Sequence, residues 1–160
     1  MDREVPGHNG IVRRAEPRDL PAVASMCHAL WPDGSLEEHT GEMAELIAGR
    51  SPGILPAVIL VAESPSGSLV GFMHAALRSY ADGCDPSRPV GYLEGWYVDP
   101  GWRRRKIGAL LVAAAEDWAR SQGCVEIASD TWLENLDSQR AHEALGFEVV
   151  DHCVNYRKRL

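Results

Sequence analysis

Four consecutive basic residues form the most distinctive chemical feature of this sequence. Arg103, Arg104, Arg105 and Lys106 follow one another in a chain with 16 lysines and arginines and a formal net charge of −7. Arginine makes charge-assisted, often bidentate hydrogen bonds to phosphate. A run of this kind is also typical of a solvated turn, so the residues beside it must decide between an anion site and an exposed loop.

The flanking residues place the run between a strand and a helix. Aromatic and β-branched residues before it, at 92–98, favour a strand, and Asp99-Pro100-Gly101 supplies a turn. After it, apolar residues recur at three- and four-residue spacing from Ile107 until Gly123, as in an amphipathic helix. The first N–H groups of a helix lack partners and its dipole adds positive charge, so a phosphate could bind there. On these residues alone, the anion site and the solvated turn remain equal alternatives.

Length and composition narrow the class of protein. A chain of 160 residues with 45% hydrophobic and 24% charged residues suits one soluble domain. We see no signal-peptide pattern and no apolar run long enough for a membrane span, so we expect a cytoplasmic protein. The four cysteines and six histidines lack the spacing of metal ligands, so we expect reduced thiols and no metal. The acidic balance argues against nucleic-acid or membrane binding and leaves a cationic partner open.

The order of the remaining elements predicts a mixed α/β sheet in one domain. We expect residues 1–10 to be disordered and residues 11–160 to form the domain. The glycine at position 95, inside a strand, indicates a bulge where a backbone N–H can turn toward a ligand. Helices are expected over 16–30, 35–48, 107–123 and 135–145, and strands over 11–15, 57–64, 68–80, 92–98, 124–131 and within 147–160.

This order, together with WRRRKIG (102–108) and ALGF (144–147), resembles the GCN5-related N-acetyltransferase (GNAT) family. The resemblance implies a central, mostly antiparallel twisted sheet flanked by four or so helices. In that family the loop after the fourth strand carries R/Q-x-x-G-x-G/A and holds the pyrophosphate of acetyl-coenzyme A at a helix N-terminus. Here the pattern falls on Arg103 to Gly108, with Lys106 in place of its first glycine. A side chain at that position restricts φ where glycine would not.

A closer likeness, from about Ile11 onward, is to the aminoglycoside 6'-N-acetyltransferases. It rests on short segments in one order and at compatible spacing: ALWP (29–32), YADGCD (80–85), LEG (93–95), ASDT (128–131), EN (134–135), SQ (138–139) and YRKR (156–159). The likeness implies acetyl-coenzyme A as cosubstrate, an aminoglycoside or other polycationic amine as substrate, and a homodimer.

The resemblance also implies roles for individual residues. It implies main-chain contacts to the pantetheine arm from Trp96, Tyr97 and Val98, and pyrophosphate contacts from Arg103, Arg104, Arg105, Lys106, Ile107 and Gly108, with Asn135 also touching the coenzyme. It implies an antibiotic pocket lined by Trp31, Tyr80, Glu94, Asp130 and Asp151. Taken singly, Trp31 could be a core residue, Glu94 a satisfied strand carboxylate and Asp130 a helix cap. Taken together, Glu94 and Asp130 at the ends of neighbouring predicted strands form an acidic mouth suited to a polyamine.

The implied reaction is direct attack of a substrate amine on the thioester in a ternary complex. Glu94 or Asp130, directly or through water, would accept the amine proton, and a main-chain N–H near Val98 would stabilise the oxyanion. Many relatives carry a tyrosine that can protonate the leaving thiolate where this chain has His142, and Tyr156 is a second candidate. The alternatives are a GNAT enzyme acting on a polyamine, peptide or other small amine, and a non-catalytic acetyl-coenzyme A-binding domain.

Overall fold

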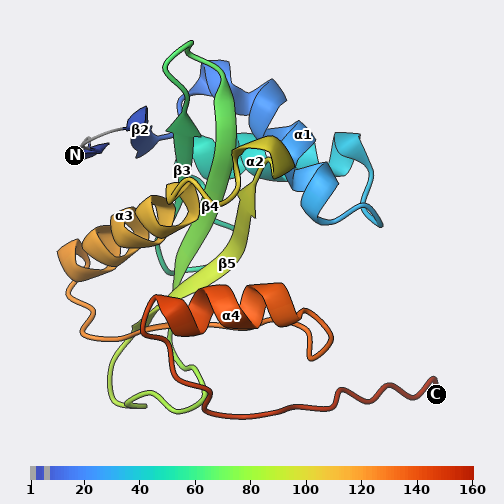
Figure 1. The fold of residues 1–160 in the computed structure, drawn as a ribbon. Helices are drawn as coiled ribbons and strands as arrows, with labels where there is room; N and C mark the ends of the chain where they lie inside the picture. Colours follow the sequence, from blue (N-terminus) through green and yellow to red (C-terminus); the bar gives the residue numbers. More distant parts are fainter. Residues whose placement is uncertain (1–2, 6–7) are drawn as a thin grey trace.

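A mixed sheet forms the centre of the computed structural model, which describes residues 3–5 and 8–160 (Figure 1). Over these residues the sheet has six strands, whose spatial order follows the chain. All neighbouring strands are antiparallel except the last pair, which is parallel. The strands are β1 (Arg3–Val5), β2 (His8–Arg14), β3 (Ala57–Glu63), β4 (Leu69–Arg78), β5 (Val90–Val98) and β6 (Ile127–Ser129).

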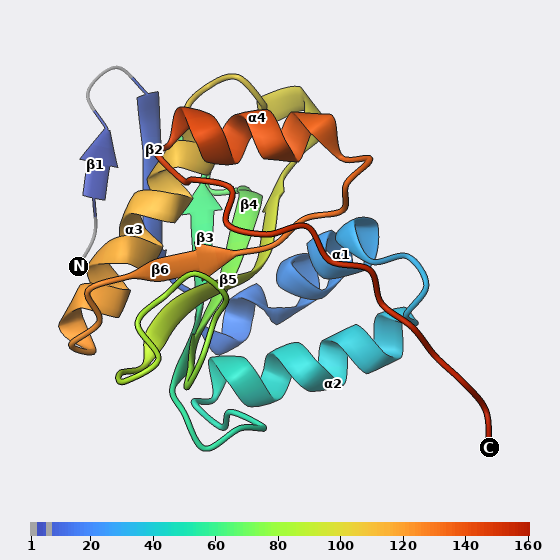
Figure 2. The same ribbon diagram turned by 90° about the horizontal axis from the view of Figure 1, so that it is seen from below.

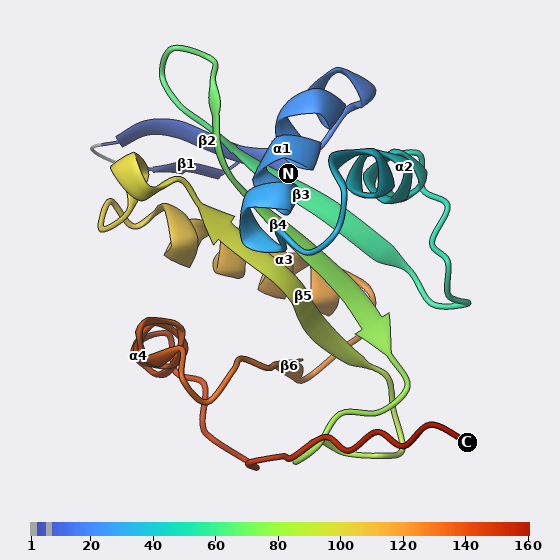
Figure 3. The ribbon, with the colours of Figure 1, turned by 90° about the vertical axis from the view of Figure 1, so that its right-hand side faces the viewer.

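Helices cover both faces of this sheet, as expected for a mixed α/β fold (Figure 3). Helices α1 (Leu20–Leu30) and α2 (Leu36–Ile47) pack on one face, where Val23 and Met43 contact Phe72 of β4 in a buried cluster. Helix α3 (Ile107–Ser121) packs on the other face, against the cluster that contains Met73 of β4. Helix α4 (Leu136–Ala144) follows β6 and contains no buried residue. Two short 3-10 helices, η1 (Pro17–Asp19) and η2 (Pro100–Trp102), precede α1 and α3.

The pairing of β5 with both of its neighbouring strands changes near the middle of β5. Toward β4, His74 pairs with Gly95 and Ala75 pairs with Leu93, so Glu94 is one extra residue on β5. This is the bulge that the sequence indicated at Gly95. Toward β6, the parallel pairing covers only Gly91–Leu93, and no strand of the described chain pairs with 94–98 on that side. The second half of β5 therefore presents backbone groups that a ligand can use.

The two ends of the chain differ from the sequence expectation. The strands expected within 147–160 are wrong, because the structure has no helix or strand there and every residue from Glu148 onward is exposed. This segment runs past the connection between β4 and β5, where Val150 lies against Gly83, and then leaves the body of the protein (Figure 2), so no described strand pairs with it. At the other end, residues 3–5 and 8–10 belong to β1 and β2 rather than to a disordered segment, while residues 1–2 and 6–7 lie outside the described residues.

Candidate active site

The basic loop, Arg103 to Lys106, connects η2 to the first turn of α3. Two of its residues, Arg104 and Lys106, have φ of 61° and 64°, in the left-handed region that side chains disfavour. Lys106 is also the N-cap residue of α3. The loop therefore keeps the backbone conformation that suits glycine although the sequence supplies lysine. Backbone strain of this kind persists where the surrounding structure requires it and is frequent at ligand sites.

The start of α3 has the features of an anion site. No side chain caps this end of the helix, and its first turn contains no acidic residue. The four basic residues are exposed, and Arg103 Nε donates a 3.0 Å hydrogen bond to the carbonyl of Val98, which joins the loop to the end of β5. Uncapped N–H groups, the helix dipole and nearby guanidinium groups all favour a phosphate. The geometry thus favours the anion site over a merely solvated turn.

Trp96 connects this loop to α4. Its ring packs against Gly108, where an added Cβ would lie 3.0 Å from Trp96 Cζ2, so glycine allows the close approach of α3 to β5. On its other side the Trp96 ring meets the His142 ring edge-on, with centroids 5.2 Å apart. Trp96 thus contacts two other expected site residues, Gly108 and His142, beside the half of β5 that has no partner on the side of β6.

His142 forms hydrogen bonds at both ring nitrogens. Nδ1 lies 2.7 Å from the carbonyl oxygen of Ser138 and Nε2 lies 2.8 Å from Ser129 Oγ. A carbonyl can only accept, so Nδ1 carries a hydrogen and, in the neutral ring, Nε2 accepts from the Ser129 hydroxyl. Only the imidazolium form of His142, with hydrogen on both ring nitrogens, would have a proton on Nε2 to pass to a ligand through Ser129. Sequence reasoning missed Ser129 although it lies in the segment ASDT.

Glu94 and Asp130 lie in one cluster, joined by two residues that sequence reasoning missed. Arg78 donates to both carboxylate oxygens of Glu94, at 2.8 and 2.6 Å. The Arg78 guanidinium carbon lies 3.5 Å from the centroid of the Tyr92 ring, a cation–π contact. The Tyr92 hydroxyl donates a 2.8 Å hydrogen bond to Asp130 Oδ1, and burial together with this bond raises the pKa of Tyr92. The acidic mouth, formed by Glu94 and Asp130, thus also contains a positive charge, that of Arg78.

Trp31 lies beside this cluster, and Tyr80 follows β4, the strand that carries Arg78. Trp31 follows α1 and its ring lies over Gly95, where any Cβ would collide with Trp31 Cη2. The ring also meets Phe72 edge-on at 6.5 Å between centroids. Tyr80 is exposed and donates to Asp82 at 2.9 Å; this hydrogen bond, with smaller contributions that include the charge of Asp151, raises the pKa of Tyr80. Both aromatic rings are available as walls for a ligand.

The remaining expected residues are less closely placed. Asp151 and Tyr156 lie on the exposed C-terminal segment, and Tyr156 is 92% exposed. Tyr156 has no described contact with His142, so the two candidate acids are not brought together. Asn135 caps α4 by accepting a 3.1 Å hydrogen bond from Ser138 N at its side-chain oxygen. Among the described residues, no group of three or more His, Cys, Asp or Glu side chains could hold a metal ion.

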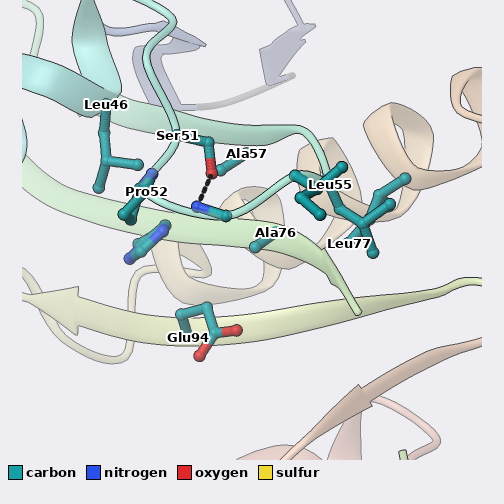
Figure 4. Close-up of a pocket in the computed structure, with 11 residues that line it drawn as sticks. Leu46, Ser51, Pro52, Leu55, Ala57, Ala76, Leu77 and Glu94 are labelled. Atoms are coloured by element: carbon teal, nitrogen blue, oxygen red, sulfur yellow. Dashed lines mark hydrogen bonds between the residues drawn. The ribbon is translucent and has the colours of Figure 1, made fainter. Parts of the chain in front are cut away.

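A pocket of about 330 Å³ opens beside the acidic mouth (Figure 4). Its walls come from α2, strands β3, β4 and β5, and the connection between α2 and β3. Most of its lining is apolar, and its titratable members are Glu94 and His74. Burial lowers the pKa of His74, while the charges of Glu94 and Glu42 oppose that shift in part. His74 is a fourth residue that sequence reasoning missed, because no motif marks it.

Comparisons with known proteins agree with this geometry. Residues 23–147 match the model of the acetyltransferase (GNAT) family. The chain is 45% identical over 150 residues, 94% of its length and 97% of the relative's, to an aminoglycoside N(6')-acetyltransferase type 1 of Klebsiella aerogenes. A relative of the same name from Serratia marcescens is 45% identical over 89% of this chain and 94% of its own length. The solved structure of AAC(6')-Iy with the bisubstrate analog CoA-S-monomethyl-acetylneamine matches with a TM-score of 0.84 and 34% identity, over 94% of this chain and 99% of that one.

Proposed function

The chain belongs to the acetyltransferase (GNAT) family, and from this premise we propose that it transfers an acetyl group from acetyl-coenzyme A to the 6'-amino group of aminoglycoside antibiotics. Acetylation of that amine would give resistance to the drug. The observation that carries the proposal is the position of β5. Its second half, 94–98, has no partner on the side of β6. This half begins at the acidic mouth and ends at the basic loop, so one strand would join a site for a polycation to a site for a diphosphate.

The residues around the basic loop fit acetyl-coenzyme A. Arg103 to Gly108 would bind the pyrophosphate with guanidinium groups and with the uncapped N–H groups of α3. The main chain of Trp96 to Val98 would hold the pantetheine arm as a strand would, since no described strand occupies that edge. Asn135, at the start of α4, is the remaining coenzyme contact that we propose. Because acetyl-coenzyme A is an intracellular metabolite, we propose a cytoplasmic location.

The same strand provides groups for the chemical step. The substrate amine attacks the thioester directly while both substrates are bound. A main-chain N–H of β5 near Val98 stabilises the developing oxyanion, because it is fixed by the sheet before the reaction begins. His142 in its imidazolium form, which carries hydrogen on both ring nitrogens, would supply a proton to the leaving thiolate through Ser129. Tyr156 is the weaker candidate for this role, because it lies on the exposed segment.

The substrate end suits a small polycation. An aminoglycoside carries several ammonium groups at neutral pH, and Glu94, Asp130 and Asp151 would bind them through charge-assisted hydrogen bonds. The rings of Trp31 and Tyr80 would flank the sugar rings. A lysine-peptide acetyltransferase needs an open groove and fewer local carboxylates, so the acidic mouth favours the antibiotic over a peptide.

We also propose that the protein is a homodimer in which the C-terminal segment of one copy packs on the other. Large apolar side chains on this segment and before α4 are exposed, among them Trp132, Val149, Val150, Val154 and Tyr156. Exposed apolar surface of this extent is typical of an interface. A variant that ends at Glu148 should then sediment as a monomer where the full chain sediments as a dimer; identical sedimentation would contradict the proposal.

A thiol-release assay with acetyl-coenzyme A tests the function. We expect rapid release with 6'-amino aminoglycosides and slow or no release with linear polyamines and lysine peptides. Faster turnover of a peptide or polyamine than of every aminoglycoside would favour the alternative GNAT substrates. Coenzyme binding without release from any amine would favour a non-catalytic domain.

A further inference from the structure

The two carboxylates of the acidic mouth are poor candidates for removing a proton from the substrate. Both oxygens of Glu94 accept hydrogen bonds from Arg78, and Asp130 accepts one from Tyr92. These hydrogen bonds occupy lone pairs with which the carboxylates would accept a proton from a substrate amine. These groups are well suited to hold ammonium groups, and a different group is needed to accept the proton.

His74 occupies a position from which it can act on the same substrate. It lies on β4 directly opposite Gly95, which adjoins the bulged residue Glu94. Its side chain lines the pocket that Glu94 also lines. The ring forms no hydrogen bond with any described residue, and no fully buried side-chain nitrogen or oxygen of the described chain lacks a partner. The nitrogens of His74 are therefore not fully buried, and a ligand in the pocket that this residue lines can reach them.

The surroundings of His74 keep it in the form that a base requires. Burial lowers its pKa from the ordinary value of 6.5, so the ring is neutral at pH 7 and has a free lone pair. The charged groups that face it are Glu94 from β5 and Glu42 from α2. Both are acidic and would stabilise the imidazolium that forms after proton transfer.

We propose that His74 is the general base of the acetyl transfer, an inference that rests on the acetyltransferase function proposed above. The 6'-ammonium group gives one proton to a ring nitrogen of His74. The neutral amine nitrogen then forms a bond to the acetyl carbon, the C–S bond breaks, and sulfur leaves with the electron pair as a thiolate. The nitrogen loses its second proton as the amide forms, the thiolate gains one, and His74 returns its proton to solvent.

Replacement of His74 by glutamine or alanine tests this role. We expect kcat to fall about 100-fold or more, the usual contribution of a general base, with little change in the KM for acetyl-coenzyme A. In the wild type, kcat/KM should fall as the pH drops through the lowered pKa of His74, and this acid limb should vanish in both variants. The control is His28→Gln on α1, where the ring bonds to the backbone of Gly34, and it should keep the limb.

Chemical rescue separates a base from a residue that only shapes the pocket. Added imidazole should restore turnover to His74→Ala, whereas pyrazole, which has the same shape and is a far weaker base, should not. Coenzyme binding measured by calorimetry confirms that each variant is folded. If His74→Ala and His74→Gln both keep wild-type activity and the acid limb of the pH profile, the role of His74 as the base is overturned, while the proposed function stands. Absence of any acetyl transfer by the wild type would instead overturn the proposed function.

Discussion

The basic loop and the acidic mouth lie at the two ends of residues 94–98 of β5, which have no partner on the side of β6. The residues that form the two regions come from the sequence in different ways. The basic loop consists of four consecutive residues and the uncapped start of α3. The acidic mouth consists of side chains from β4, from β5 and from Asp130 after β6, which strand pairing brings together. The diphosphate site that we propose is thus encoded by a local motif, whereas the proposed polycation site depends on the register of the sheet.

The two regions also differ in backbone strain and in how their charges are paired. The basic loop contains strained backbone, with Arg104 and Lys106 in the left-handed region and no anionic side chain at the start of α3. The acidic mouth contains compensated charge, with Glu94 held by Arg78. A ligand of the loop therefore fills a prepared site, whereas a ligand of the mouth must compete with a cation that is already present. Changes at the two ends should give separate and different effects.

The largest effect is expected when the loop loses two guanidinium groups. Replacing Arg103 and Arg105 together by alanine should weaken coenzyme A binding by about 3–6 kcal/mol, because two charge-assisted hydrogen bonds are lost at about 1.5–3 kcal/mol each. Calorimetry gives the measurement. Pantetheine, which has no diphosphate, is the control ligand and should bind both proteins equally. An equal loss for pantetheine would show that the loop does not hold the pyrophosphate.

The next effect is expected at the opposite end of β5. Asp130→Asn should raise the apparent KM for an aminoglycoside by the equivalent of about 1.5–3 kcal/mol and leave the KM for acetyl-coenzyme A unchanged. Its shape is preserved, so only the charge is tested. The affinity of this variant should also depend less on salt than that of the wild type. Should both KM values rise together, the two ends of β5 are not separate sites.

A smaller effect is expected from Lys106 and concerns stability. Lys106→Gly should relieve the left-handed strain and raise the free energy of unfolding by up to about 1 kcal/mol, partly offset by the larger entropy of glycine in the unfolded chain. Urea denaturation gives the measurement, and Lys106→Ala is the matched control that removes the same charge without relieving strain. Equal stability of the two variants would contradict the conformational explanation.

The same contrast explains how much the sequence could predict. The basic loop, the bulge beside Gly95 and the nearness of Glu94 to Asp130 followed from motifs and from strand order. His74, Arg78 and Tyr92 could not be identified in this way, because a single extra residue in β5 decides which side chains share a face. Strands are also expected within 147–160, yet a strand needs a partner, and none of the described strands lies beside that segment.

The central claim is acetylation of one particular amine, and a matched pair of aminoglycosides tests it most directly. Two compounds that differ only in carrying an amino or a hydroxyl group at the 6' position should be incubated with acetyl-coenzyme A, with thiol release and the NMR spectrum of the product as readouts. We predict release only with the 6'-amino compound and an amide at that nitrogen. Equal release with the 6'-hydroxyl compound, or an acetyl group on another nitrogen, would contradict the account.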